Sequence, residues 1–366
     1  MPASLNTPEI KIEFHTSPVS EADRTQALES PGFGKVFTDH MVLARWTPEH
    51  GWHDAKVTPR RPLELDPASA VLHYAQEIFE GMKAYRADDG RILLFRPEEN
   101  ARRFAQSAAR MAMPAVPTEL FLKAVEELVR VDKEWIPSGD GSLYLRPFMF
   151  ANEAFLGVRP AQEYIFCIIA SPVGAYFKGG AKAVSLWVET EYTRAAAGGT
   201  GAAKCGGNYA ASLVAQAEAA KKDCDQVVFL DAAEHRWVEE LGGMNVFFVM
   251  NDGSVVTPPL GGTILPGITR ASVIVLAEER GLRVEQRPYS FAEWQNDAAS
   301  GKLVEAFACG TAAVLAGIGL VRHAGGEFLI GDGQTGKLTS ELRQELVGLQ
   351  KGVTNDERGW TRRILA

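Results

Sequence analysis

The pattern of apolar and polar positions predicts a mixture of helices and strands in the first half of the chain. Residues up to about 32 show no regular period and are expected to form an irregular arm. Apolar positions three and four apart predict helices at residues 97–111 and 118–135, the second with a plausible N-cap at its first residue. Strands are expected at residues 142–150 and 164–170. The second strand is almost wholly apolar, which indicates burial on both faces.

After a glycine-rich stretch at residues 172–183, the pattern changes to strands that are joined by turns and four helices. Asn251-Asp252-Gly253 is typical of a hairpin turn. We therefore expect an N-terminal domain at residues 1–175, an interdomain loop at 176–186 and a larger domain at 187–366. The expected helices are 209–221, 269–280 with Gly281 as its stop, one that begins at Ser290 with a Ser290–Glu293 capping box, and 338–349; the strands are 227–230, 237–240, 246–250 and 303–309.

Composition narrows the classes of function. A chain of 366 residues is long enough for two cores. Acidic residues exceed basic ones by 46 − 38 = 8, which argues against nucleic acid as a partner. The four cysteines are scattered and favour neither a disulfide framework nor a zinc site, and no metal is expected. The first 20 residues do not resemble a signal peptide, and no run is long enough to span a membrane. These features predict a cytoplasmic protein.

Lys204 is the residue with the most informative surroundings, because glycine and alanine flank it in residues 198–207. Small residues let the backbone approach a ligand closely. An amine in such a place can hold a phosphate or form a Schiff base with a carbonyl cofactor. It can also be an ordinary lysine of a surface loop. The phosphate-loop pattern fails in detail, since Ala203 replaces its last glycine and Cys205 replaces the hydroxyl residue that would hold magnesium.

Other residues could complete a pyridoxal phosphate site, although each also has an ordinary structural explanation. Residues 265–270 form a Pro-Gly turn directly before a helix, a suitable place for a phosphate. One of two adjacent carboxylates, Glu239 or Glu240, could face the pyridine nitrogen. Tyr209, near a helix start, could donate to the ring oxygen, and the turn at residues 310–312 could bind a carboxylate.

A cation on the helix at 97–111 could add charge at the phosphate, but the pattern does not separate Arg103 from Arg102. His50 and His53 lack a third ligand for a metal. Catalytic motifs of serine hydrolases and zinc proteases are absent from the sequence.

Taken in order, these residues resemble a known family, the branched-chain amino acid aminotransferases, which are pyridoxal-phosphate enzymes of fold type IV. The resemblance runs from about residue 30 to the C-terminus. It implies a two-domain α/β (α+β) fold like that of D-amino acid aminotransferase, with a smaller N-terminal domain and a larger pseudo-barrel domain. The matching segments are residues 32–34, 37–41, 72–76, 79–85, 142–147, 171–177, 204–209, 240–245, 265–270 and 310–312.

The resemblance also implies roles for individual residues. Lys204 would carry the cofactor, pyridoxal 5'-phosphate, Glu240 would face its ring nitrogen and Tyr209 its ring oxygen. Arg146 would lie near the distal carboxylate of glutamate, and Val158 would enter the pocket of the partner in a homodimer. The remaining cofactor contacts would be Arg103, Leu265, Gly267, Ile268, Thr269 and Thr311, and the substrate pocket would be Phe33, Tyr74, Phe79, Tyr144, Tyr176, Gly243, Thr311 and Ala312.

The implied reaction is transamination between leucine, isoleucine or valine and 2-oxoglutarate. D-Amino acid transamination and aminodeoxychorismate lysis are alternatives within the same fold type, and the segment 37–41 disfavours both. Gly243 stands where many relatives have threonine, and Ala313 and Ala316 stand where vertebrate enzymes carry a redox-active cysteine pair. Burial among small residues near a cationic ring is expected to lower the pKa of Lys204.

Overall fold

The computed structural model describes residues 8–174 and 182–365. The chain divides into two compact units. Unit 1 consists of Met1–Tyr176, Ala203–Gly206 and Gly348–Ala366, and unit 2 of Phe177–Ala202 and Gly207–Val347. Each unit has its own sheet and its own core.

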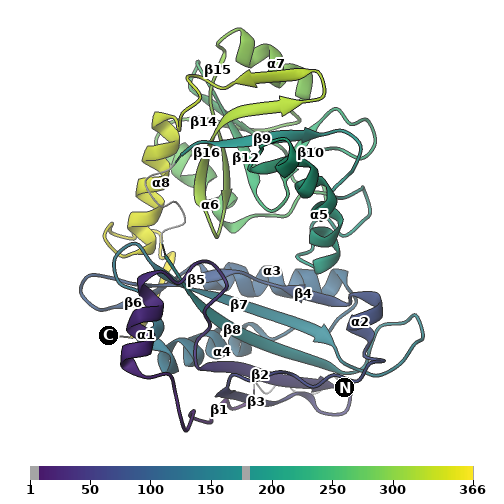
Figure 1. The fold of residues 1–366 in the computed structure, drawn as a ribbon, viewed down its shortest axis with the longest axis vertical. Helices are drawn as coiled ribbons and strands as arrows, with labels where there is room; N and C mark the ends of the chain where they lie inside the picture. The colour runs from purple at the N-terminus through teal and green to yellow at the C-terminus, as the bar shows by residue number, and fades with distance from the viewer. Residues whose placement is uncertain (1–7, 175–181, 366) are drawn as a thin grey trace. The chain divides into compact units, whose positions relative to one another are not determined.

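Unit 1 is built on a sheet of nine described strands in the order β1-β3-β2-β8-β7-β5-β6-β18, with β4 paired to β7 (Figure 1). Neighbouring strands are antiparallel, apart from the short parallel pair of β1 and β3. The strands are β1 (Lys11–Ile12), β2 (His40–Thr47), β3 (Gly51–Pro59), β4 (Glu77–Phe79), β5 (Met82–Arg86), β6 (Ile92–Phe95), β7 (Ser142–Ala151), β8 (Tyr164–Val173) and β18 (Thr361–Leu365).

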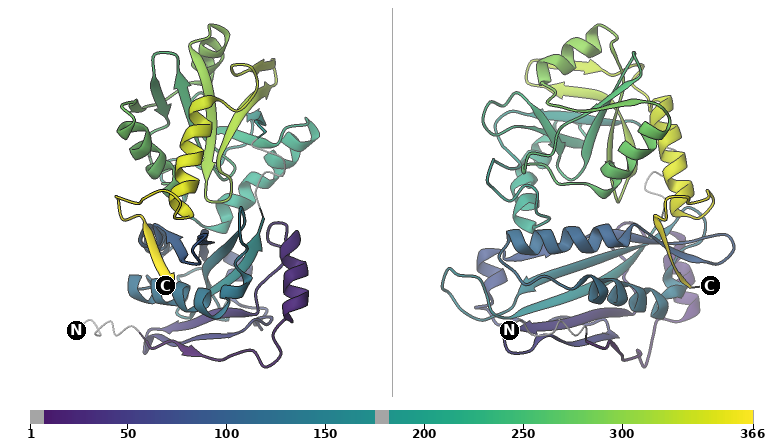
Figure 2. Two further views of the ribbon diagram at one scale, coloured as in Figure 1. Left: turned by 90° about the vertical axis from the view of Figure 1, so that its left-hand side faces the viewer. Right: turned by 180° about the vertical axis from the view of Figure 1, so that it is seen from behind.

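Two helices, α3 and α4, cover one face of this sheet (Figure 2, right). Phe104 of α3, Phe121 of α4 and Phe166 of β8 meet with ring centroids 5.4–5.9 Å apart, and all three are fully buried. Such ring pairs add about 0.5–1.5 kcal/mol each beyond the burial of their area. The helices of unit 1 are α1 (Glu21–Glu29), α2 (Ala70–Tyr74), α3 (Pro97–Arg110), α4 (Thr118–Val131) and the short η1 (Lys133–Trp135).

Unit 2 contains a second sheet of nine described strands, in the order β11-β10-β9-β16-β15-β12-β13-β14, with β17 paired to β16. A tight turn joins β11 to β12, in which the Leu241 N–H donates to the Met244 carbonyl. Because β11, the first strand of the order, contacts β12 near its other end, the sheet curls back on itself. The strands are β9 (Val184–Glu189), β10 (Gln226–Leu230), β11 (Val238–Leu241), β12 (Asn245–Met250), β13 (Ser254–Thr257), β14 (Arg283–Gln286), β15 (Leu303–Gly310), β16 (Val314–His323) and β17 (Gly326–Leu329).

The core of unit 2 is centred on β12, where the Phe248 ring lies 4.4 Å from Tyr289 and 5.0 Å from Trp294 between centroids. Ser290 caps α7 as expected, since its hydroxyl accepts from the Glu293 N–H. Later helices of the chain are α5 (Gly206–Lys221), α6 (Ile268–Glu279), α7 (Phe291–Ala299) and α8 (Lys337–Gln350). Among the described residues, no helix is long and apolar enough to cross a membrane.

The structure confirms the mixed α/β class, but it corrects several details of the sequence prediction. The arm contains β1 and α1, which are too short or too weakly patterned to predict. Thr118 is the first residue of α4 and Pro117 its N-cap, without a capping hydrogen bond from a side chain. Residues 348–366 belong to unit 1 because β18 pairs with β6, whereas the expected division assigned them to the second domain. Part of the expected interdomain loop lies outside the described residues.

Candidate active site

The backbone of Lys204 is held from two sides within unit 1. Its N–H donates to the Ser107 hydroxyl of α3 at 2.9 Å, and its carbonyl accepts from the Phe79 N–H of β4 at 2.9 Å. The Lys204 Nζ lies 4.7 Å from the centroid of the Phe79 ring. Lys204 is therefore a partly buried residue whose backbone is held on both sides, and not a freely solvated lysine of a surface loop.

Burial is the main cause that lowers the pKa of the Lys204 amine, to about 8. The nearby charge of Arg103 lowers this pKa further, while the carboxylate of Glu80 acts in the opposite direction. Both effects follow the usual rules, since desolvation and a like charge each disfavour the ammonium form. This direction agrees with the expectation from burial among small residues, and the nearby cation in the structure is Arg103.

Glu80 is a site residue that the sequence reasoning missed. It is 0% exposed and forms a bidentate ion pair with Arg103, with Nε–Oε1 at 2.7 Å and Nη2–Oε2 at 2.8 Å. The Asn100 amide and the Gly81 N–H also donate to Oε2. The pair settles which arginine of α3 faces inward, because the Arg102 side chain is 60% exposed and bonds Glu99.

Glu77 is a second missed carboxylate near Lys204. The Gly206 N–H donates to Glu77 Oε1, and burial raises the pKa of this carboxyl. A side chain at residue 206 would collide with the same oxygen, so Gly206 permits the contact. The only sequence signal for either carboxylate is its position among apolar residues at 77–82.

Aromatic and cationic side chains predicted for the substrate pocket also gather in unit 1. The Arg146 guanidinium lies 4.8 Å from the Phe79 ring centroid, and its Nη2 donates to the Tyr144 hydroxyl at 3.2 Å. The half-exposed Phe33 packs edge-on against Tyr144, with centroids 5.1 Å apart. Gly81 leaves room for this arrangement, because a Cβ there would overlap the Tyr144 hydroxyl. The Arg146 Nε is buried and makes no hydrogen bond.

Tyr74 and Val158 have different surroundings from this cluster. The Tyr74 hydroxyl donates to the Leu156 carbonyl, and Tyr74 is 41% exposed. Val158 is 89% exposed. Tyr176, which was also predicted for the pocket, lies outside the described residues.

In unit 2, the Glu240 carboxylate is fixed by two donors. It forms an ion pair with Arg194, and its Oε1 accepts from the Leu265 N–H at 2.8 Å. Both side chains are at most 5% exposed. The sequence reasoning missed Arg194, whose signal is a single arginine before the small residues 195–203.

The neighbouring Glu239 is buried as well, so strand alternation does not separate the two carboxylates. Glu239 is 8% exposed and accepts from the Thr263 hydroxyl. Burial raises the pKa of Glu239, and its Oε2 makes no hydrogen bond. The direct ion pair with Arg194 is the feature that distinguishes Glu240.

The turn before α6 is anchored to the same part of unit 2. The Asn245 amide donates to the Leu265 carbonyl at 3.1 Å, and a side chain at Gly267 would collide with the Asn245 oxygen. Gly267 is the N-cap of α6, and no side chain caps the helix there. The first N–H groups of a helix have no partner within it, so Ile268 and Thr269 stand at a suitable place for an anion.

Tyr209 and Gly243 lie together in unit 2. A Cβ at Gly243 would be 3.7 Å from the Tyr209 Cε1, which is ordinary contact. Tyr209 belongs to α5, which begins three residues earlier than its pattern predicted. Thr311 and Ala312 follow β15 in the partly exposed turn to β16. Among the described residues, no group of histidine, cysteine and acidic side chains could hold a metal.

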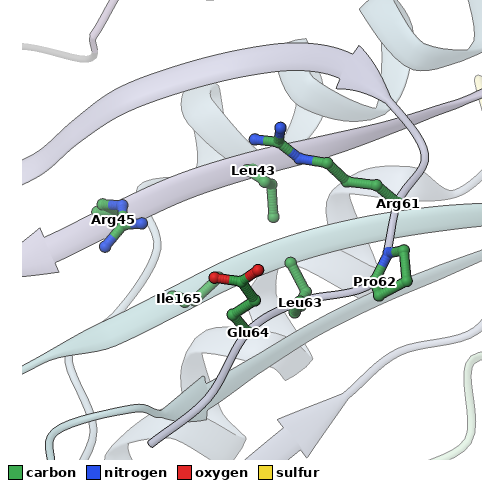
Figure 3. Close-up of a pocket in the computed structure, with 7 residues that line it drawn as sticks. All are labelled: Leu43, Arg45, Arg61, Pro62, Leu63, Glu64 and Ile165. Atoms are coloured by element: carbon green, nitrogen blue, oxygen red, sulfur yellow. The ribbon is translucent and has the colours of Figure 1, made fainter.

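A separate hollow of about 360 Å³ lies over β2 and β8 of unit 1 (Figure 3). Its lining shares no residue with the site around Lys204 and includes the exposed Arg45, Arg61 and Glu64. Figure 3 shows these charged side chains around an apolar floor of Leu43 and Ile165. We do not assign a role in catalysis to this hollow.

Comparisons with known proteins identify the family of the chain. A family model described as "Amino-transferase class IV" matches residues 77–321. A branched-chain-amino-acid aminotransferase of Mycolicibacterium smegmatis is 54% identical over 361 residues, which cover 97% of this chain and 98% of that protein. A protein of the same name from Mycobacterium tuberculosis is 54% identical over 353 residues, covering 95% and 96%.

Solved structures of branched-chain amino acid aminotransferases also match the chain. The crystal structure of the branched-chain amino acid aminotransferase of Escherichia coli matches with a TM-score of 0.75 and 27% identity, covering 89% of this chain and 99% of that one. The branched-chain amino acid aminotransferase of Thermobaculum terrenum, in its PLP-form, matches with a TM-score of 0.70 and 25% identity, covering 90% and 99%. With these matches over nearly its whole length, the chain belongs to the class IV aminotransferases.

Proposed function

We propose that this protein is a pyridoxal-phosphate-dependent aminotransferase that exchanges the amino group between branched-chain L-amino acids and 2-oxoglutarate. The products are the branched 2-oxo acids and L-glutamate, so the two half-reactions balance without an external oxidant. The observation that carries the proposal is the partly buried Lys204, whose amine has a pKa of about 8, in a class IV aminotransferase chain. The names of the relatives support the branched-chain substrate.

The donors of the described residues fit pyridoxal 5'-phosphate. A lysine with a lowered pKa supplies the amine for covalent attachment. The uncapped start of α6, at Ile268 and Thr269, suits the phosphate, with Leu265, Gly267, Arg103 and Thr311 as further contacts. Glu240, charged and paired with Arg194, suits a protonated ring nitrogen, and Tyr209 suits the ring oxygen.

Each of these side chains has a defined task in the reaction. When bound, the cofactor supplies an electron sink that stabilises negative charge at the substrate Cα. Lys204, once displaced from the cofactor, removes the proton from the substrate Cα as a general base. This requires the neutral amine, which a pKa near 8 makes available at neutral pH. Arg194 and the Leu265 N–H both stabilise the charged form of Glu240, which suits a carboxylate that faces a protonated ring nitrogen.

The substrate side chain would be accepted by the aromatic residues Phe33, Phe79 and Tyr144, with Tyr176 and Gly243 as further walls. Apolar contacts distinguish a single methylene by only about 1–3 kcal/mol, so leucine, isoleucine and valine should all be substrates. The buried Arg146 Nε, which makes no hydrogen bond, supports a role for Arg146 at the distal carboxylate of glutamate. Thr311 and Ala312, with Tyr74, are proposed at the α-carboxylate.

We also propose that the protein acts as a homodimer in which Val158 enters the partner's pocket. Support comes from large apolar side chains in one part of unit 1 that are 41–89% exposed: Leu72, Tyr74, Leu156 and Val158. Exposed apolar clusters of this kind are typical of protein interfaces. A cytoplasmic location is proposed on the sequence alone.

Borohydride labelling and coupled assays test the proposed function together. The protein is incubated with pyridoxal 5'-phosphate, reduced and digested, and the labelled peptide is identified by mass spectrometry. We expect the label on Lys204 and turnover with L-leucine and 2-oxoglutarate. Turnover with D-alanine or with aminodeoxychorismate, and not with L-leucine, would favour the alternative activities of this fold type.

A further inference from the structure

Glu80 has the environment of a residue that acts through its neighbour. Its carboxylate is fully buried, and four donor groups from three residues point at it: two of Arg103, the Asn100 amide and the Gly81 N–H. Burial has the largest influence on the pKa of Glu80 and acts to raise it. The charge and hydrogen bonds of Arg103, with smaller contributions from Lys204 and Asn100, outweigh burial and hold this pKa below its ordinary value, so the carboxylate stays ionised.

The geometry of the ion pair fixes the direction of the Arg103 guanidinium. Glu80 binds the edge formed by Nε and Nη2. A planar guanidinium held on one edge presents its other edge in a defined direction. Glu80 therefore orients the cation that we propose for the phosphate.

The same ion pair lies close to Lys204, because the Lys204 carbonyl accepts from the N–H of Phe79, the residue before Glu80, and the Lys204 N–H donates to Ser107 of the helix that carries Arg103. The charged and titratable groups that act on its amine are Arg103 from α3, Glu80 after β4, and Tyr144 and Arg146 from β7. Arg103 and Arg146 disfavour the ammonium form, and Glu80 favours it. Removal of Glu80 would leave the charge of Arg103 unbalanced beside the amine.

We propose that Glu80 is a positioning residue that orients Arg103 and balances its charge beside Lys204, and thereby sets the pH range in which Lys204 exchanges its proton. The inference deepens the proposed function and rests on it for the role of Lys204. It concerns the amine itself, however, and can be measured without substrate.

The test is competitive acetylation of the full chain freed of cofactor, with acetic anhydride between pH 6 and 10. Peptide mass spectrometry gives the extent of labelling at Lys204, and its midpoint is the titration of that amine. In Glu80→Gln, the midpoint should fall by about one pH unit, because an opposite charge nearby is lost. Glu99→Gln is the matched control, since Glu99 lies on α3 but bonds the exposed Arg102, and its midpoint should equal that of the wild type.

Variants of Arg103 make the test independent of the stability of Glu80→Gln. In Arg103→Gln, the midpoint should rise, and in the double variant Glu80→Gln/Arg103→Gln it should return to within a few tenths of a pH unit of the wild type. If Glu80→Gln does not fold, the comparison of Arg103→Gln with the double variant decides the question. Equal midpoints with and without Glu80 would overturn the proposal. Failure of the wild type to transaminate would instead overturn the proposed function and leave these midpoints valid.

Discussion

The buried charges of the two units are arranged in different ways. In unit 1, the Glu80 carboxylate near Lys204 is bound to Arg103, and burial lowers the pKa of the Lys204 amine to about 8. In unit 2, Glu240 has a direct ion pair with Arg194 and a backbone donor. The first arrangement suits a group that must gain and lose a proton, and the second suits a group that must keep its charge. Their difference matches the tasks that we propose for the two residues.

The largest effect is expected when the Lys204 amine, the group that gains and loses a proton, is removed. Lys204→Ala should reduce kcat for L-leucine by about 10⁴-fold, because it removes both the attachment point and the general base. Lys337→Ala is a suitable control, since the Lys337 side chain is 89% exposed, and it should leave kcat unchanged. A Lys204→Ala protein that retains more than a tenth of the wild-type rate would contradict the assignment.

The second test separates the two adjacent carboxylates of β11. Glu240→Gln should lower kcat by about 10²–10³-fold, a typical effect of removing a fixed charge from an active site. Glu239→Gln should change kcat by less than about threefold, because Glu239 bonds Thr263, whereas Glu240 makes the ion pair with Arg194. Steady-state kinetics with folded variants measure both. Equal losses would mean that burial, and not the ion pair, selects the functional carboxylate.

The comparison between the units also explains what could be predicted from the sequence. The sequence predicted Lys204, Tyr209 and the turn at 265–270 as candidate site residues. Glycine and proline near them indicate local backbone geometry, which can be inferred from neighbouring residues alone. The ion pairs were not predictable, since Glu80 and Arg103 are 23 residues apart and only the fold brings them together. The choice of Glu240 over Glu239 came from the resemblance alone, and Arg194 now gives it a physical basis.

Boundaries of elements were less predictable than their existence. Helices α3 and α6 were expected within one residue of both observed ends, whereas α5 begins at Gly206 and not at Tyr209. A glycine pair is unfavourable in a helix interior, so pattern alone starts the helix too late.

A third test uses the stability of the chain without cofactor. Lys204 has a folded pKa of about 8, below its ordinary value of 10.5, so the unfolded state binds more protons between these values. The free energy of unfolding should therefore rise with pH between about 8 and 10.5, by about 3 kcal/mol from this group. Urea unfolding of the wild type and of Lys204→Met isolates the contribution, which the variant should lack. If the free energy of unfolding depends on pH in the same way in both proteins, the pKa of Lys204 is not lowered in the folded state.

The smallest expected effect concerns Gly243. A side chain there would meet the Tyr209 ring at ordinary contact distance, so Gly243→Thr should fold and narrow the pocket. We expect kcat/KM to fall by about three- to tenfold for L-leucine and less for L-valine, in line with about 1 kcal/mol per methylene. Gly261→Thr is the control, because a Cβ there would have no neighbour within 4 Å. If the ratio of the kcat/KM values for L-leucine and L-valine does not change, Gly243 does not line the substrate pocket.

The pairing of β18 with β6 has a consequence for biosynthesis. Residues 361–363 and 365 are the partners of residues 92–95, so β6 gains this neighbour only after residues 361–365 have been translated. Contacts between residues so far apart in sequence form late, since a long loop must first be closed. Unit 1, although its synthesis begins first, is therefore completed after the residues of unit 2 have emerged from the ribosome. A chain that stops before Thr361 would expose β6 as an open sheet edge, where aggregation begins.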